Sequence, residues 1–229
     1  TGGVAVSLAI SATVAENIIA SNNIATISNS ILGTAGDLGG GVTVEALTDT
    51  KIDALAAAIA LSVAVSSGAG VSVSGAGVEA KNTLDNTTEA SIKLGSDVNA
   101  SGAVLVDAKD MSNILSDIAT VSAAIGISSG VGVSITVAVT LAENDIDSNT
   151  IATIDASQVD GSTVTVNALN DATIDTLAAT IAMSISGGTG AGISGAGAGV
   201  KAKNTITSTT QASITADSTV YADGAVLID

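Results

Sequence analysis

Large and small residues alternate along several stretches of this chain. In residues 131–141 every second residue is Val, Ile or Leu, and Gly, Ser, Thr or Ala stand between them. The same alternation occurs in residues 4–10 and 59–65. A period of two residues is typical of β-strands, whereas an amphipathic helix repeats every 3.6 residues. The pattern therefore predicts long strands and no α-helix of note.

Three uncharged windows, at residues 54–78, 118–142 and 176–200, are long and apolar enough to resemble membrane-spanning helices. Each window is interrupted near its middle by a cluster of Ser and Gly, as in residues 66–70. No aromatic belt or Lys/Arg cluster flanks the windows, as usually happens beside membrane spans. We therefore expect two strands joined by a tight turn in each window, and no membrane insertion.

The two faces of these predicted strands differ in size. One face carries Val, Ile and Leu, and the other carries Ala, Ser, Gly and Thr. We expect the large apolar face to fill the core, because burying apolar surface drives folding. We expect the small face to let another sheet or backbone approach closely, and so to be a candidate contact between copies.

A short signature, Ala-[Glu/Lys]-Asn, occurs four times, at intervals of about 60 residues. A fixed long period indicates a repeat architecture. We divide the chain into four approximate units and the start of a further one; they are residues 1–41, 42–103, 104–163, 164–225 and 226–229.

A unit of this size cannot bury its apolar face alone, but stacked units form a continuous core. The sequence therefore predicts a parallel β-solenoid, similar to a β-helix, built from four repeats of about 60 residues. One wide coil per unit would align four asparagines as an amide ladder: Asn17, Asn82, Asn144 and Asn204. Beside them would run a row of charges that alternate in sign: Glu16, Lys81, Glu143 and Lys203.

The alternative is two or three small coils of about 20–30 residues per unit. Small coils would separate the asparagine and charge rows, and the alternation of sign would then have no purpose. We favour the wide coil for this reason.

Composition excludes several classes of function. The net charge is −16 and the chain has no Arg or His, so no basic patch can form to bind nucleic acid. Without His or Cys there is no Ser-His-Asp triad and no ordinary zinc site. An enzyme built on a β-helix, such as a polysaccharide lyase, is disfavoured because aromatic residues and Arg are missing from any substrate cleft.

Carboxylates are the remaining candidates for chemistry. Asp145 with Asp147, and Asp107 with Asp110, could in principle do acid–base work, but we expect them on a solvated face. Asp37, Asp145 and Asp147 are weak candidates for calcium ligands, because oxygen ligands in turns suit this ion. The Gly-Gly-x-Gly-x-Asp repeat of calcium-binding β-rolls does not occur. We therefore expect no catalytic residues and no cofactor.

Several motifs recur in a fixed order: Ala-[Glu/Lys]-Asn-x-[Ile/Leu], Ala-[Ser/Thr]-Ile, Ser-x-Val and Val-x-Val-x-Ala. Over essentially its whole length the chain resembles the repeat regions of very large bacterial surface proteins, the filamentous-haemagglutinin-like and leukotoxin-type filamentous adhesins. The resemblance implies secretion, a long β-solenoid stalk, and a role in adhesion or extracellular architecture.

These observations predict a non-enzymatic structural protein at the cell surface or outside the cell. Its coils would stack into an extracellular filament, so we expect a homo-oligomer or filament formed by self-association. The alternative is the stalk of a surface adhesin, which attaches to a host or neighbouring cell through a tip outside this segment. The chain begins without Met, and we interpret it as a segment of something longer.

Overall fold

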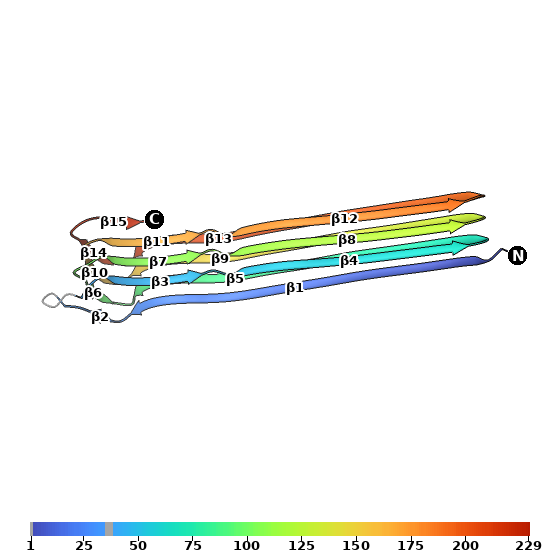
Figure 1. Cartoon of the computed structure of the whole chain (residues 1–229). Coiled ribbons are helices and arrows are strands. Elements are labelled where there is room, and N and C mark those ends of the chain that lie inside the picture. Colours follow the sequence, from blue (N-terminus) through green and yellow to red (C-terminus); the bar gives the residue numbers. More distant parts are fainter. Residues whose placement is uncertain (1, 35–38) are drawn as a thin grey trace.

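Long parallel strands in four stacked sheets make up the computed structural model, which describes residues 2–34 and 39–229 (Figure 1). All pairings between these strands are parallel, and no described residue is helical, so no helix in those ranges could span a membrane. The expected all-β class is therefore confirmed. In chain order the strands are Val4–Ser28 (β1), Ile31–Leu32 (β2), Val42–Thr48 (β3), Lys51–Ser66 (β4), Ala69–Lys93 (β5), Asp97–Asn99 (β6), Val104–Asp110 (β7), Asn113–Ser128 (β8), Val131–Asp155 (β9), Gln158–Gly161 (β10), Val164–Asn170 (β11), Thr173–Gly188 (β12), Ala191–Thr215 (β13), Thr219–Ala222 (β14) and Val226–Ile228 (β15).

Each strand pairs with the strand four places along the chain. The sheet orders are β1-β5-β9-β13, β3-β7-β11-β15, β4-β8-β12 and β2-β6-β10-β14. In the longest sheet the signature asparagines pair at separations of 65, 62 and 60 residues. Small coils would require pairings about 20–30 residues apart, and none occurs among the described strands. The strands therefore pair in the register expected for wide coils and not in the register expected for small coils.

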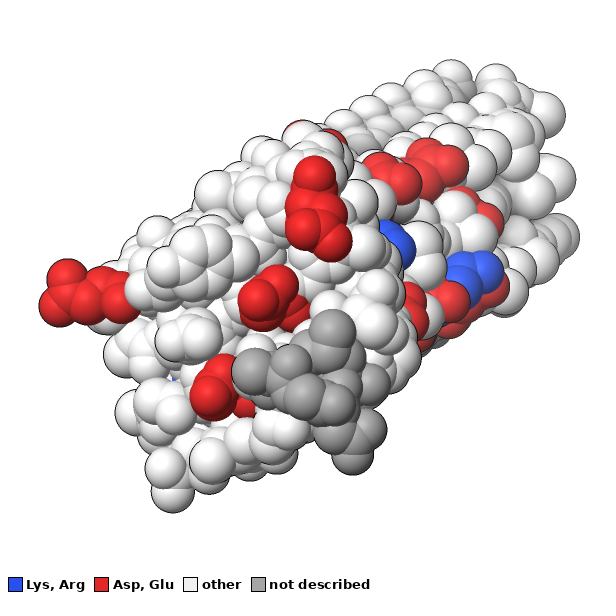
Figure 2. Space-filling view, turned by 90° about the vertical axis from the view of Figure 1, so that its left-hand side faces the viewer, with Lys and Arg blue, Asp and Glu red and all other residues white. Residues whose placement is uncertain are grey.

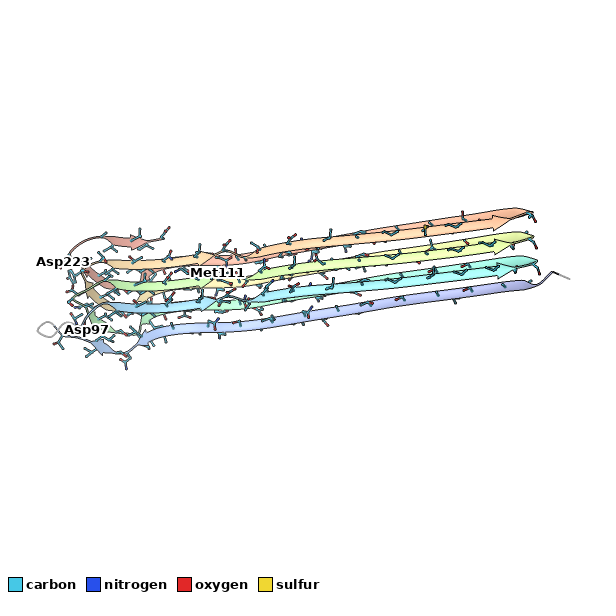
Figure 3. The ribbon with its side chains drawn as sticks, in the orientation of Figure 1. Asp97, Met111 and Asp223 are labelled. Atoms are coloured by element: carbon cyan, nitrogen blue, oxygen red, sulfur yellow. The ribbon has the colours of Figure 1, made fainter. Side chains whose placement is uncertain are left out.

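The molecule has a head and a long, thin arm (Figure 1). In the arm, β4, β8 and β12 form one layer and the first parts of β1, β5, β9 and β13 form the other. Short turns join the layers at the tip, as at residues 67–68. The head holds the short strands at the opposite end, where Asp97 and Asp223 lie, and Met111 lies at the base of the arm (Figure 3).

The head has an apolar core enclosed by three of the sheets. Its buried residues come from β3, from the ends of β5 and β9, and from the short strands that follow β5 and β9. The largest of them are Ile92, Ile154, Val98, Val104, Val106, Val159, Val164 and Val166, each at most 1% exposed. Here apolar side chains point inward, as the hydrophobic effect requires.

In most of the arm the expected orientation of the two faces is wrong. The small residues point inward, between the two layers: Ala138 is 0% exposed and Ala58 is also buried. The large apolar residues point outward, and Ile59 next to Ala58 is 71% exposed. The same inversion holds in β1, where Leu8 and Ile10 are exposed. The small faces are therefore not free to make contacts between copies.

The close approach of the two layers explains this inversion. A Cβ atom added at Gly126 would lie 2.7 Å from the carbonyl oxygen of Val133, and one at Gly132 would lie 3.0 Å from that of Gly126. Contacts this short leave no room for Leu or Ile between the layers. Hydroxyl groups fill the narrow interior instead, and Thr136 donates to Ser122, which donates to Ser74, at 2.6 and 2.9 Å.

We expect Ala138→Leu to lower the free energy of unfolding by about 1–3 kcal/mol, because a larger side chain overpacks the closed interior of the arm. The matched control is Ala57→Leu, whose side chain lies on the exposed face of β4 and has room for the added atoms. Urea unfolding of the two variants checks this. Equal stabilities would contradict the inward orientation of the small residues.

Candidate functional site

A hydrogen-bonded row of asparagine side chains crosses the longest sheet. Asn17 Nδ2 donates to Asn82 Oδ1 at 2.8 Å, and Asn82 Nδ2 donates to Asn144 Oδ1 at 2.7 Å. Asn144 Nδ2 donates to Asn204 Oδ1 at 2.9 Å. The structure thus brings all four asparagines of the Ala-[Glu/Lys]-Asn signature together, with every amide pointing the same way.

The asparagine row faces the interior of the arm. Asn82 and Asn144 are both 0% exposed. Hydroxyls from the opposite layer add further partners: Asn82 Nδ2 contacts Ser116 Oγ at 3.3 Å, and Asn144 Nδ2 contacts Thr176 Oγ1 at 2.8 Å. Buried amides need such partners, because an unsatisfied one costs about 1–3 kcal/mol. The row therefore fixes the register of the coils rather than offering a site to a ligand.

The charge row lies on the other side of the same sheet, because successive side chains of a strand point to opposite faces. Glu16 pairs in register with Lys81, Lys81 with Glu143, and Glu143 with Lys203. Within this row the described residues form one ion pair, Lys203 Nζ to Glu143 Oε1 at 3.4 Å. Both of its side chains are more than half exposed, so the pair contributes little stability.

The Asp107 and Asp110 side chains are buried, contrary to the expected solvated face. Asp107 lies on β7 and accepts hydrogen bonds from Lys109 and from Asn167, the latter at 2.8 Å. Asp110 is 0% exposed and accepts from Ser112, while its Oδ2 has no partner among the described residues. Strand alternation points the two carboxylates in opposite directions, so they do not form an acid–base pair.

One group in each of two ion pairs has a shifted pKa: Glu89, which pairs with Lys93, and Lys109, which pairs with Asp107. The hydrogen bond from Lys93 lowers the pKa of Glu89, and a second hydrogen bond from Ser91 lowers it further. The hydrogen bond to Asp107 raises the pKa of the Lys109 ammonium. Both shifts favour the charge that each group already carries at neutral pH. Neither group is therefore tuned toward proton transfer near pH 7.

The calcium candidates do not come together. Asp145 and Asp147 lie two residues apart on β9, where Asp145 pairs with Thr83 and Thr205. Asp147 lies beside Asp85, but no three His, Cys, Asp or Glu side chains gather anywhere in residues 2–34 and 39–229. Asp37 lies outside the described residues.

Sequence reasoning missed the exposed apolar surface of the arm. We call the outward surface of β1, β5, β9 and β13, from the tip to the charge row, the outer face. A signal for it was present: Gly75 and Gly77 of one unit stand where Val137 and Val139 stand in the next. That difference between neighbouring units has no counterpart on the buried side, where Ala76 pairs with Ala138.

No protein-family model matches this chain, and neither a curated protein nor a solved structure does.

Proposed function

We propose that this chain is a section of an extracellular fibre, a parallel β-solenoid of four repeats of about 60 residues with a structural and non-enzymatic role. The single observation that carries the proposal is the continuous asparagine row with its alternating charges. Stacked coils share backbone hydrogen bonds along the axis, so the fibre resists tension through a ladder that runs its whole length.

Both ends of the asparagine row are suited to extension. Asn17 has its Oδ1 free to accept, and Asn204 has its Nδ2 free to donate, among the hydrogen bonds of the described residues. A second copy stacked on β13 would therefore place its Asn17 to accept from Asn204. β1 and β13 each pair on one side within their sheet, and an open edge is a template for another strand.

The charge row supports the same head-to-tail order. It begins with Glu16 and ends with Lys203, so a following copy would set its Glu16 beside Lys203. The alternation of sign then continues across the junction, which favours this neighbour over a copy in the reverse order. The net charge of −16 keeps separate fibres soluble and apart.

We expect Lys203→Glu to raise the lowest concentration at which fibres form by about threefold to tenfold, because it sets like charges beside each other at every junction. Lys201→Glu is the matched control. It makes the same change of charge on the same strand, but Lys201 pairs with Leu141 and would meet Val14 of the next copy. Negative-stain microscopy across a dilution series of the two variants makes the measurement.

Two outcomes would contradict the fibre. If the wild-type chain gave only short, separate rods at high concentration, the alternative of a surface adhesin stalk with its binding tip elsewhere would be favoured. If both Lys variants weakened assembly equally, net charge rather than the alternating row would govern association.

A further inference from the structure

The outer face is apolar and uncharged from the tip of the arm to the row of Ala12, and the next row, that of Val14, carries Glu79 and Lys201. On β1 it carries exposed Val and Ile side chains, and β9 carries a similar series that includes Val137 and Val139. Figure 2 shows charged side chains over the head and the base of the arm on the side it displays, and none on the far part of the arm. A protein of net charge −16 thus keeps most of this surface free of charge. Such surfaces mark interaction sites.

Glycines on this face have no role within a single copy. A Cβ atom added at Gly75, Gly77 or Gly197 would meet nothing within 4 Å. None of them has a positive φ angle, and glycine weakens a strand interior. Packing of the chain against itself therefore does not explain them. Glycine in a strand also marks a place where another molecule approaches closely.

The glycines and the large residues alternate from strand to strand. In register, Ile10 is followed by Gly75, then Val137, then Gly197. The next outward row begins with Ala12 and continues with Gly77, Val139 and Gly199. Large residues on β1 and β9 thus form ridges on either side of a groove over β5. Part of this groove is lined by Val14, Gly77 and Val139.

We propose that the outer face binds the outer face of a second copy of this chain, about a two-fold axis that runs parallel to the strands between β5 and β9. This axis places β5 over β9 of the second copy and β1 over its β13. Val137 of each copy then enters the groove at Gly75 of the other, and Ile10 enters the groove at Gly197. A two-fold interface must be self-complementary, and this corrugation meets that condition.

The charge row fits the same axis. It places Lys81 opposite Glu143 of the second copy, and Glu16 opposite its Lys203. All four meetings within the charge row are therefore between opposite charges. In the row of Val14, Lys201 of the second copy lies over Val14, one strand away from Glu79. Farther toward the head, Asp85 would meet Asp147, so the contact ends just beyond the charge row. The row of Val71 and Val133 has no small residue, so there the large side chains of the two copies would face each other. They fit if the two sheets lie about 10 Å apart, which is the usual distance between packed sheets.

The size of the outer face is sufficient for a stable pair. About 11 residues on each of four strands cover about 36 by 19 Å, or about 700 Å² per copy. The pair would bury about 1,400 Å² in total, within the range of specific interfaces. A bilayer would also cover apolar surface, but fluid hydrocarbon needs no row of glycines shaped to a partner's ridge. The second copy therefore explains both the ridges and the grooves.

The pairing deepens the proposed self-association. Only its effect on the width of a fibre rests on the proposed fibre function, because two copies can also pair in solution. The test is Gly75→Val/Gly77→Val, which fills a groove that is empty in the single copy. The matched control is Ala57→Val/Ala119→Val, which adds similar side chains to the exposed face of β4 and β8. We expect the glycine variant to fold, to weaken pairing at least tenfold, and to leave fibre length unchanged with the mass per unit length halved. The control variant should match the wild type.

Fibre length reports stacking, and mass per unit length reports pairing, so the two proposals fail separately. If no fibres form, sedimentation velocity still separates wild-type dimers from monomers of the glycine variant. A wild-type chain that stays single in fibres and in solution would overturn the pairing. The pairing would also be overturned if the wild type and the glycine variant floated equally well with phosphatidylcholine vesicles. That result would assign the outer face to lipid.

Discussion

Ile146→Ala is expected to lower the free energy of unfolding by about 2–5 kcal/mol, the usual loss when a buried Ile is cut back to Ala. Ile146 is 0% exposed and packs with Leu84 and Ile114 where the arm meets the head. It also stacks in register on Leu84 and Ile206 of the neighbouring levels. Truncation leaves a cavity that these stacked neighbours cannot close, because backbone hydrogen bonds hold the levels at a fixed spacing of about 4.8 Å.

Ile59→Ala is the matched control for this prediction. Ile59 undergoes the same chemical change, but it lies on the outward surface of β4. We expect its effect to stay within about 0.5 kcal/mol, as for most surface substitutions. Urea unfolding of both variants gives the two values. A larger loss at Ile59 than at Ile146 would mean that the arm buries its large residues after all.

Asn82→Ala is expected to cost about 2–4 kcal/mol, because it leaves one fully buried partner and one half-buried partner unsatisfied. Asn17 loses the acceptor of its Nδ2, and Asn144 loses the donor to its Oδ1. Asn144 is fully buried, so water does not replace the lost donor without opening the arm. The cavity left by the missing amide adds to the loss.

The control for the asparagine row is Asn204→Ala. Asn204 ends the row and is exposed, so water can satisfy the Nδ2 of Asn144 that it leaves behind. We expect a loss of less than about 1 kcal/mol, measured by urea unfolding at a concentration below that at which fibres form. If Asn82→Ala were as mild as Asn204→Ala, the asparagine row would not contribute to the stability of the coils.

The sequence was sufficient to predict the long strands of the arm, the turns between them and the register of the signature asparagines. The two-residue period of residues 131–141 excluded a helix, and β9 spans these residues. The spacing of the Ala-[Glu/Lys]-Asn signature placed Asn82 beside Asn144, where the structure has them. These features were readable because strand alternation and register depend on local pattern and on a repeat length, both of which are written in the chain.

The inside of the arm could not be read in the same way. Alternation shows that a strand has two faces, but it does not show which face is buried. The hydrophobic rule favours the large face, whereas the short distance between the layers at Gly126 and Gly132 admits only small residues. That distance is a property of the two folded layers together, and the alternation along either strand does not show it. Asp107 and Asp110 were misjudged for a similar reason, since their burial depends on neighbouring levels.

The inverted arm gives the proposed fibre its most specific property. A fibre with an apolar core and a polar surface would stack but would stay single. This chain instead keeps hydroxyls inside the arm and presents Val, Ile and Leu outside, where in the proposed pairing they would meet the outer face of a second copy. In the proposed fibre, stacking would set the length of the assembly, and the outer face would set its width.

The measurement that tests the account most directly is the distance between nitroxide spin labels at positions 81 and 143, in a chain without native cysteine. Lys81→Cys and Glu143→Cys place both labels on the outer face in adjacent levels, about 4.8 Å apart at the backbone. We expect strong dipolar broadening for this pair, in labelled chain diluted with unlabelled chain, and none for Lys81→Cys with Ala103→Cys, whose side chain is also exposed. Broadening in the second pair but not in the first would mean small coils, and would contradict the wide coil on which the fibre and its pairing depend.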